Sequence, residues 1–214
     1  ILLPEIAKIL DRPLEKYAVE LVNVDSVAFS PFVNLFSSQN VQTCFSKVAI
    51  VTDDDRCTKK NETNYINKDF DYDDVNSDIS GKLLSGTPSE RCNELETLCR
   101  AVGINVFKAT KTLEYALCCD ENNIEYFIEA IKSEYSQLGP ALEQKVNSLH
   151  DMNEKAACVW LFIRAREKCK GAIAQYISQI IKKQCEMRKR GENIEKEFVI
   201  PDYLKEAVYC VTER

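Results

Sequence analysis

The feature that most constrains the fold is a run of apolar residues that ends in three consecutive aspartates. Residues 48–52 read Val-Ala-Ile-Val-Thr, and residues 53–55 are all aspartate. An almost continuously apolar run of this length is typical of a β-strand that is covered on both faces. Such strands belong to the parallel sheets of α/β proteins, so the run predicts an α/β fold with parallel strand pairing.

The flanking segments alternate between strand and helix patterns. Residues 18–24 (Ala-Val-Glu-Leu-Val-Asn-Val) have the length and β-branching of a strand, and residues 104–107 predict a third, short strand. A helix is predicted from Ser30, a good N-cap, with a proline at its first position. Another is predicted after Ser89 and ends before Gly103, which suits the left-handed conformation that follows a helix.

These patterns divide the chain into two parts. We expect residues 1–122 to form the α/β core, with the polar segment 56–88 as a loop or mobile insertion because it has few periodic apolar positions. Residues 123–214 are expected to be helical and to complete the same domain. Within them, residues 153–190 read as one nearly continuous helix, and Pro201 starts the last helix.

Composition narrows the class of protein. With 45% hydrophobic and 29% charged residues, the chain of 214 residues has the balance of a globular protein. Its apolar runs fall short of the roughly 18–20 residues that a bilayer span needs, and its first residues resemble no secretion signal. We therefore expect no membrane contact. The net charge of −6 argues against a generic electrostatic DNA binder.

The cysteines indicate a reducing compartment. There are ten cysteines but no Cys-x-x-Cys pair, and His150 is the only histidine, which argues against a structural zinc site. Most cysteines fall at apolar positions of predicted helices, where a thiol behaves as a small hydrophobic group. Reduced, buried cysteines and a cytoplasmic location are therefore expected.

Charge is distributed unevenly along the sequence. Residues 53–78 contain eight aspartates, whereas residues 155–190 contain ten basic residues against two glutamates. An acidic cluster at a strand end and a separate basic helical face would suit contact with a phosphate backbone through a metal ion. The alternative is that the basic residues only form a solvated helix face.

The three aspartates stand where ligands bind in open parallel sheets, at the carboxyl end of a strand. In an extended segment, Asp53 and Asp55 project to the same side. Two neighbouring carboxylates repel each other unless a cation or a proton lies between them, and Mg²⁺ takes one or two carboxylates together with water and phosphate oxygens. The pattern favours a metal site, and the alternative is a solvated turn, in which aspartate is common.

Two other kinds of aspartate site have a similar pattern. Asp69, Asp71 and Asp73 imitate the first ligands of a calcium-binding EF-hand loop. The required glycine is Asp74 and the closing glutamate is Ser80, which excludes that loop. Aspartates after a strand also occur in receiver domains and in phosphatases with an aspartate nucleophile. These stay as alternatives, and they predict a covalent aspartyl-phosphate.

Several segments, taken in order, resemble one known domain. They are residues 2–7 (Leu-Leu-Pro-Glu-Ile-Ala), the strand ending at 22–24 (Val-Asn-Val), 27–33 (Val-Ala-Phe-Ser-Pro-Phe-Val) and 48–55. Together they resemble the Toprim domain of the OLD-family endonucleases (overcoming lysogenisation defect). Residues 111–114 (Lys-Thr-Leu-Glu) and 170–174 (Lys-Gly-Ala-Ile-Ala) resemble two later signatures of that domain.

The resemblance implies a Toprim-like parallel sheet flanked by helices, with a mainly α-helical C-terminal extension, and a metal-dependent DNA endonuclease activity. Asp53 and Asp55 match the family's D-x-D metal ligands, and Glu114 matches a later acidic ligand. Lys170 matches the lysine placed near the scissile phosphate. Asp53, Asp55 and Lys170 would then be catalytic. The implied cofactor is Mg²⁺ or Mn²⁺, in a two-metal site in the complete protein.

Two of these assignments have plainer alternatives. Acidic residues are favoured in the first turn of a helix, which alone would account for Glu114. Lys170 also fits as one more exposed lysine on a basic helix. Asp120 and Glu121 are neighbouring acids that we keep as reserve candidates.

As partners, the resemblance implies DNA, an N-terminal ABC-type ATPase domain, a second copy of the chain and a helicase-like protein, in phage defence or DNA processing. The chain starts at Ile1 without an initiator methionine, and we interpret it as a fragment. The family's first motif carries a glutamate before the segment matching residues 2–4, so we expect the chain alone to bind Mn²⁺ weakly and to cleave DNA poorly. The alternative function is a non-catalytic module that docks DNA or a protein in a larger ATPase assembly.

Overall fold

In the computed structural model, which describes residues 1–24, 28–36, 47–60 and 63–213, two strands form a parallel sheet. β1 (Ala49–Asp53) pairs with β2 (Asn105–Ala109), and Asp53 lies opposite Ala109. Parallel strands need a long crossover connection, and here it contains two helices, α3 (Ser77–Ser85) and α4 (Glu90–Ala101). The predicted parallel pairing of these two segments is confirmed.

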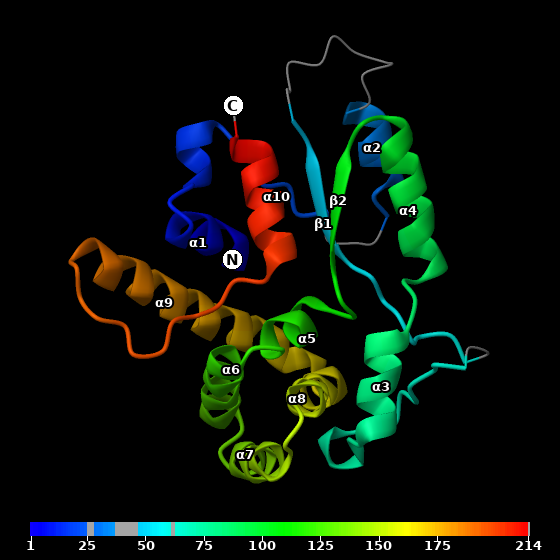
Figure 1. The fold of residues 1–214 in the computed structure, drawn as a ribbon, viewed down its shortest axis with the longest axis vertical. Coiled ribbons are helices and arrows are strands. Elements are labelled where there is room, and N and C mark those ends of the chain that lie inside the picture. Colours follow the sequence, from blue (N-terminus) through cyan, green and yellow to red (C-terminus); the bar gives the residue numbers. More distant parts are fainter. Residues whose placement is uncertain (25–27, 37–46, 61–62, 214) are drawn as a thin grey trace.

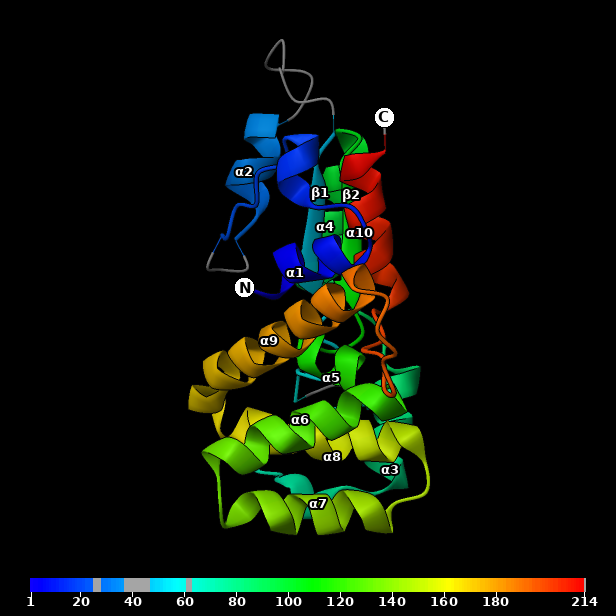
Figure 2. The ribbon, with the colours of Figure 1, turned by 90° about the vertical axis from the view of Figure 1, so that its left-hand side faces the viewer.

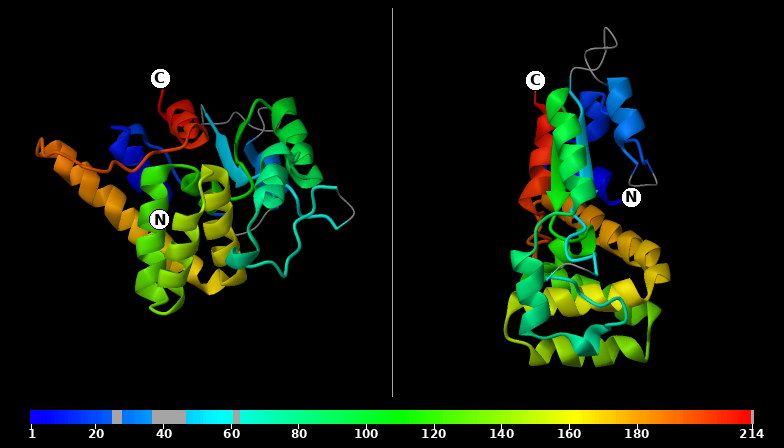
Figure 3. Two further views of the ribbon diagram at one scale, coloured as in Figure 1. Left: turned by 60° about the horizontal axis from the view of Figure 1, so that its bottom comes forward. Right: turned by 90° about the vertical axis from the view of Figure 1, so that its right-hand side faces the viewer.

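Helices cover both faces of the sheet. α10 (Asp202–Thr212) packs on both strands, whereas α4 packs on β2 and contacts α2 (Ser30–Phe36). Figure 3 shows α10 and α2 on opposite sides of the strands. A small core fills the space between α2, α4 and the sheet; it contains Val33, Ile50, Leu95, Cys99 and Ile104. Helices therefore pack on both faces of the apolar run, although only Ile50 of β1 is buried and the other residues of the strand are partly exposed.

The rest of the chain is a group of helices at the carboxyl end of the strands (Figures 1 and 2). It contains α5 (Leu113–Cys118), α6 (Glu121–Glu134), α7 (Leu138–Ser148), α8 (Met152–Ala165) and α9 (Lys170–Lys189). α1 (Leu2–Ile9) packs along α9, and α3 packs against α8. The molecule is therefore a mixed α/β protein, mostly helical, with a small parallel sheet.

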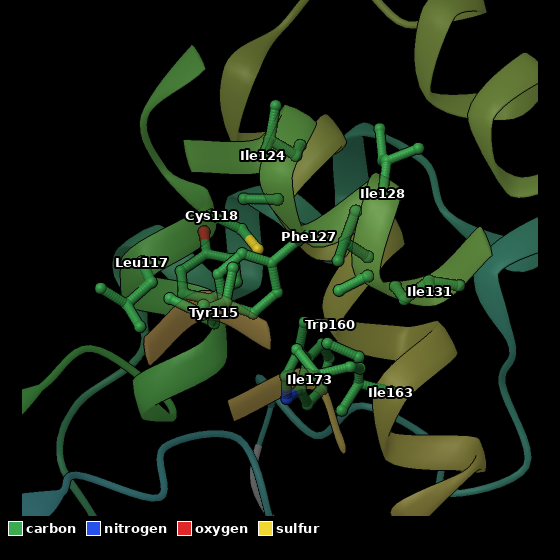
Figure 4. Close-up of a cluster of buried hydrophobic side chains, with 14 of the residues drawn as sticks. Tyr115, Leu117, Cys118, Ile124, Phe127, Ile128, Ile131, Trp160, Ile163 and Ile173 are labelled. Carbon is green, nitrogen blue, oxygen red and sulfur yellow. The ribbon is translucent and has the colours of Figure 1, made fainter. Parts of the chain in front are cut away.

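The larger hydrophobic core lies inside this helical group. Figure 4 shows Tyr115, Leu117 and Cys118 of α5 against side chains of α6, and Trp160 near Ile173. The three α5 residues are each at most 1% exposed. Because burying a large apolar side chain contributes about 1.5–3 kcal/mol, this contact fixes a helix of only six residues.

The predicted strand at residues 18–24 is wrong. A short 3₁₀ helix (Leu14–Tyr17) ends with Ala18 in the left-handed region, at φ 54°, and the following residues form no regular element. Leu21 and Val22 are 48% and 57% exposed. β-branched composition favours a strand only where a neighbouring strand and a buried face exist. Among the described residues no strand pairs with this segment, and most of its side chains are exposed.

The predicted loop at residues 56–88 is only partly correct, since the described part of the segment contains a 3₁₀ turn (Tyr72–Asp74) and α3. Val75, Ile79 and Leu83 are buried at a spacing of four residues and pack in the larger core. Asn76 caps α3 by accepting a hydrogen bond from the Ile79 N–H at 3.0 Å. The Asn76 cap and the apolar residues spaced four apart are together a signal for a helix. The sequence prediction overlooked this signal because many aspartates surround it. Residues 61 and 62 lie outside the described part.

The nearly continuous helix predicted for residues 153–190 is interrupted. α8 ends at Ala165, a 3₁₀ turn covers Glu167–Cys169, and α9 begins at Lys170. Neither proline nor glycine lies within the break itself, at residues 166–169, and Arg166 at its start makes a tertiary contact that is described below. The helix predicted after Pro201 is confirmed as α10.

The cysteines within the described residues are free, and seven of these nine are buried; Cys44 lies outside that part of the chain. No helix of the described residues is long and apolar enough to cross a membrane.

Candidate metal centre

Three of the residues singled out from the sequence meet at the carboxyl end of the sheet. Asp53 is the last residue of β1, Glu114 is the second residue of α5, and Lys170 is the first residue of α9. The Lys170 Nζ lies 3.4 Å from a Glu114 carboxylate oxygen. Both Glu114 and Lys170 interact electrostatically with Asp53. Segments far apart in the chain thus supply two acids and one base to one place.

Asp53 is the most perturbed acid of the site. Its Oδ1 accepts a hydrogen bond from the Leu113 N–H at 2.9 Å. Burial and, after it, the nearby carboxylates of Glu114 and Asp55 raise the pKa of Asp53 to about 7, and they outweigh the lowering by the Leu113 N–H and by Lys170. A partly buried carboxylate among other carboxylates is short of positive charge, which is the electrostatic condition that favours a bound cation.

Asp55 does not join this pair. Its backbone φ is 50°, so the alternation of the strand ends at Asp54. The Asp55 carboxylate instead forms an ion pair with Arg91 of α4, with Nη2 and Oδ2 2.6 Å apart. The expectation that Asp53 and Asp55 project to the same side assumed an extended segment, and the left-handed residue breaks that assumption.

Asp54, between the two candidate ligands, has a structural environment. It is 2% exposed and forms a buried ion pair with Arg56, with Nη2 and Oδ2 2.6 Å apart. Its Oδ1 accepts hydrogen bonds from the backbone N–H groups of Lys111, at 2.9 Å, and of Arg56, at 3.1 Å. Burial lowers the pKa of Lys111, whose Nζ donates to the Arg56 carbonyl oxygen. This network fixes the two loops that hold the site.

Sequence reasoning missed two residues at this place. Arg91 was not singled out, because it lies in α4, 36 residues after Asp55, and no local pattern links the two. Tyr203 of α10 was missed as well, and its hydroxyl is buried without a hydrogen-bond partner among the described residues. Burial, followed by the charges of Asp53 and Glu114, raises the pKa of Tyr203, so its hydroxyl stays protonated and able to donate. No local pattern marks this tyrosine.

The side chains at this place meet some of the requirements of a binding site for a hard divalent cation. Asp53 and Glu114 offer carboxylate oxygens, which Mg²⁺ and Mn²⁺ accept in sets of one or two. The Tyr203 hydroxyl, which has no hydrogen-bond partner among the described residues, is an uncharged hydrogen-bond donor near these two carboxylates. Within the described residues, however, no group of three or more Asp, Glu, His or Cys side chains is arranged to hold a metal ion. The residues present thus suit a single ion on two carboxylates, and the expected third ligand, Asp55, lies outside the set.

The basic face expected on residues 155–190 is only partly available to a ligand. Arg164 donates to the carbonyl oxygens of Asn67 and Phe70, and Arg166 pairs with Asp71. Exposed basic side chains remain on α9 and at its C-cap; they are Lys170, Lys182, Lys183, Arg188, Lys189 and Arg190. Lys170, Arg188 and Arg190 each pair with a glutamate. Fewer basic side chains of residues 155–190 are therefore available to contact a ligand than the sequence indicates.

The reserve acids lie away from the pair of candidate ligands. Asp120 caps α6, because its Oδ1 accepts a hydrogen bond from the Asn122 N–H at 2.9 Å. Glu121 is exposed in the first turn of the same helix. Their positions are those of an ordinary helix start.

Comparisons with models of protein families, with curated proteins and with solved structures found no match to this chain.

Proposed function

We propose that this chain is a metal-dependent endonuclease module that hydrolyses phosphodiester bonds of DNA. The observation that carries the proposal is the meeting of Asp53, Glu114 and Lys170 at the carboxyl end of two parallel strands. This edge is where open α/β sheets bind ligands. In this proposal the sheet is the centre of a Toprim-like domain, and the chain works beside an ATPase domain, as in the OLD-family endonucleases that the sequence resembles.

Asp53 and Glu114 would hold the cation. A Mg²⁺ or Mn²⁺ ion bound there would neutralise charge on a phosphodiester and lower the pKa of the water that attacks it. Asp53 is held rigidly for this task by the Leu113 N–H, and Glu114 by the buried residues that follow it in α5. Tyr203 would donate a hydrogen bond into the same space.

Lys170 would stabilise the negative charge that develops on the phosphate. Its side chain is 44% exposed, so substrate can reach it, and it begins α9 with its Nζ beside Glu114. A fixed cation near a phosphoryl group of this kind typically supplies a few kcal/mol of transition-state stabilisation. The ion pair with Glu114 keeps the lysine at the site when no phosphate is bound.

The test is nicking of supercoiled plasmid DNA by the protein in the presence of Mn²⁺. We expect Asp53→Asn to lower the rate by about 10²-fold or more and Lys170→Met by about 10- to 10²-fold. Two matched controls remove the same charges elsewhere. Asp78→Asn alters an exposed acid of α3, and Lys132→Met alters a lysine that pairs with Glu143, so both should cleave within about twofold of wild type.

Cleavage by both site variants at the wild-type rate would contradict the assignment. DNA binding without any Mn²⁺-dependent cleavage by the wild-type protein would contradict the enzyme proposal and support the alternative of a docking module. A covalent aspartyl-phosphate after incubation with a small phosphodonor would favour a phosphoacceptor instead.

A further inference from the structure

One arginine holds the third acid of the strand end. The Arg91 Nη2 lies 2.6 Å from the Asp55 Oδ2 and also donates to the backbone carbonyl oxygen of Asp53 at 3.0 Å. Both side chains of the ion pair are only partly exposed, 27% for Arg91 and 34% for Asp55. One amino group therefore ties the Asp55 carboxylate to the end of β1.

This contact accounts for the incomplete set of acids. Asp55 is close enough to Asp53 to raise the pKa of that carboxyl, yet its own carboxylate pairs with Arg91, and the described residues contain no group of three acids placed to hold a metal ion. The left-handed conformation of Asp55 is uncommon for residues other than glycine, although aspartate adopts it more readily than most, and neighbouring contacts help to hold it. Arg91 is one of those contacts, and the Thr58 hydroxyl, which donates to the Asp55 carbonyl oxygen at 2.9 Å, is another.

We propose that Arg91 is a positioning residue that withholds Asp55 from the cation site and so sets the cation concentration at which the site fills. The inference rests on the proposed metal site at Asp53 and Glu114 and names how that site is regulated. A divalent cation must compete with a guanidinium for the Asp55 carboxylate. Removing the guanidinium frees the carboxylate to turn toward Asp53 and act as a third ligand.

The surroundings of the ion pair leave Arg91 room to move away from Asp55. An open groove of about 430 Å³ borders the ion pair and is lined by Asp55, Arg91, Thr58, Ser89 and Glu94 among others. The second terminal nitrogen of Arg91, Nη1, is buried and has no hydrogen-bond partner among the described residues. Among the described residues, Arg91 is therefore held through Nη2 alone, which contacts the Asp55 carboxylate and the Asp53 carbonyl oxygen, so its release from Asp55 breaks fewer contacts than the network around Asp54 contains.

The experiment measures the dissociation constant of Mn²⁺ from the electron paramagnetic resonance signal of the free ion. We expect Arg91→Gln to bind Mn²⁺ about fivefold or more tightly than wild type. Arg91→Lys keeps the charge but has one donor group in place of the fork, so its affinity should lie between the two. It also serves as a second variant if the glutamine protein folds poorly. Arg100→Gln on the same helix, whose side chain is exposed, should leave the affinity within about twofold.

A double-mutant cycle separates release of Asp55 from a general change in charge. Asp55→Asn alone should change the affinity by less than about twofold, because Arg91 already withholds that carboxylate. In Asp55→Asn/Arg91→Gln the gain seen for Arg91→Gln should vanish. A gain that persists in the double variant, or an equal gain for Arg100→Gln, would overturn the proposed role of Arg91.

The outcome also distinguishes this inference from the proposed function. If wild-type Mn²⁺ binding is weakened by Asp53→Asn but unchanged by Arg91→Gln, the metal site stands and the role of Arg91 is wrong. If Asp53→Asn leaves Mn²⁺ binding unchanged, the metal site itself is wrong, and the inference is overturned with it.

Discussion

Asp53 and Asp54 are adjacent in the sequence but have opposite electrostatic surroundings. Asp54 faces Arg56 and two backbone N–H groups, so its charge is compensated. Asp53 receives one backbone N–H and faces the carboxylates of Glu114 and Asp55. Because neighbouring residues of a strand point to opposite faces, one acid is structural and the other is available for a ligand. A run of three aspartates does not reveal which is which.

The two residues should therefore respond oppositely to the same substitution. Asp53→Asn keeps an acceptor for the Leu113 N–H and removes a repelled charge, so we expect it to raise the free energy of unfolding at pH 8 by about 1–3 kcal/mol without metal. Asp54→Asn leaves the Arg56 guanidinium buried without its counter-charge and should lower it by about 3 kcal/mol. Urea unfolding of both variants measures these changes.

The pH dependence follows from the pKa of Asp53, which rises from 3.8 to about 7 on folding. Between these values the folded wild type binds more protons than the unfolded chain, so the free energy of unfolding falls as pH rises through this window. Asparagine does not titrate. The advantage of Asp53→Asn should grow from about pH 4 to pH 7 and stay constant above about pH 8. An advantage that shrinks with rising pH would contradict the account.

At the scale of elements, one ion pair lies at the break between α8 and α9. Arg166, just after α8, holds Asp71 through two hydrogen bonds of 2.8 Å each and lies over the Phe162 ring at 4.0 Å. Burial alone would raise the pKa of Asp71, but the hydrogen bonds from Arg166 and from the Tyr72 N–H outweigh it, and the pKa is lowered. The turn that follows sets Lys170 beside Glu114.

Breaking this pair should loosen the segment around Asp71 and the start of α9. We expect Arg166→Gln to lower the free energy of unfolding by about 1 kcal/mol and to speed amide hydrogen exchange in residues 67–75 and 167–172. The matched control is Arg190→Gln, which removes an exposed pair with Glu192 and should leave that exchange unchanged. If both segments exchange as slowly in Arg166→Gln as in the wild type, the ion pair does not hold them.

The elements that the sequence predicts well are those with their own burial pattern. The apolar strand at β1, the cap and closing glycine of α4, and the proline before α10 all have local signals, and the structure has these elements. The failures are segments whose conformation depends on distant partners. In the part of the chain that the structure describes, no strand pairs with residues 18–24, and the break before Lys170 lies beside the contact of Arg166 with Asp71, almost a hundred residues away.

At the scale of the whole molecule, the candidate centre lies where the sheet meets the helical group. Asp53 comes from β1, Glu114 from α5, Lys170 from α9 and Tyr203 from α10. Asp53, Glu114 and Lys170 could be predicted from the sequence, because each belongs to a segment that is recognisable as a strand end or by its resemblance to a family motif. The sequence could not show that Asp55 turns to Arg91 or that Tyr203 reaches the acids, since both depend on how separate elements pack.

The most direct test of the central claim is a calorimetric titration of the protein with Mn²⁺ at pH 7.5. The account predicts one binding event that is weakened about tenfold or more by Asp53→Asn and by Glu114→Gln. The control Asp78→Asn, which removes an exposed charge on α3, should bind like wild type. An isotherm that Asp53→Asn and Glu114→Gln leave unchanged would contradict the claim that these two carboxylates form a cation site.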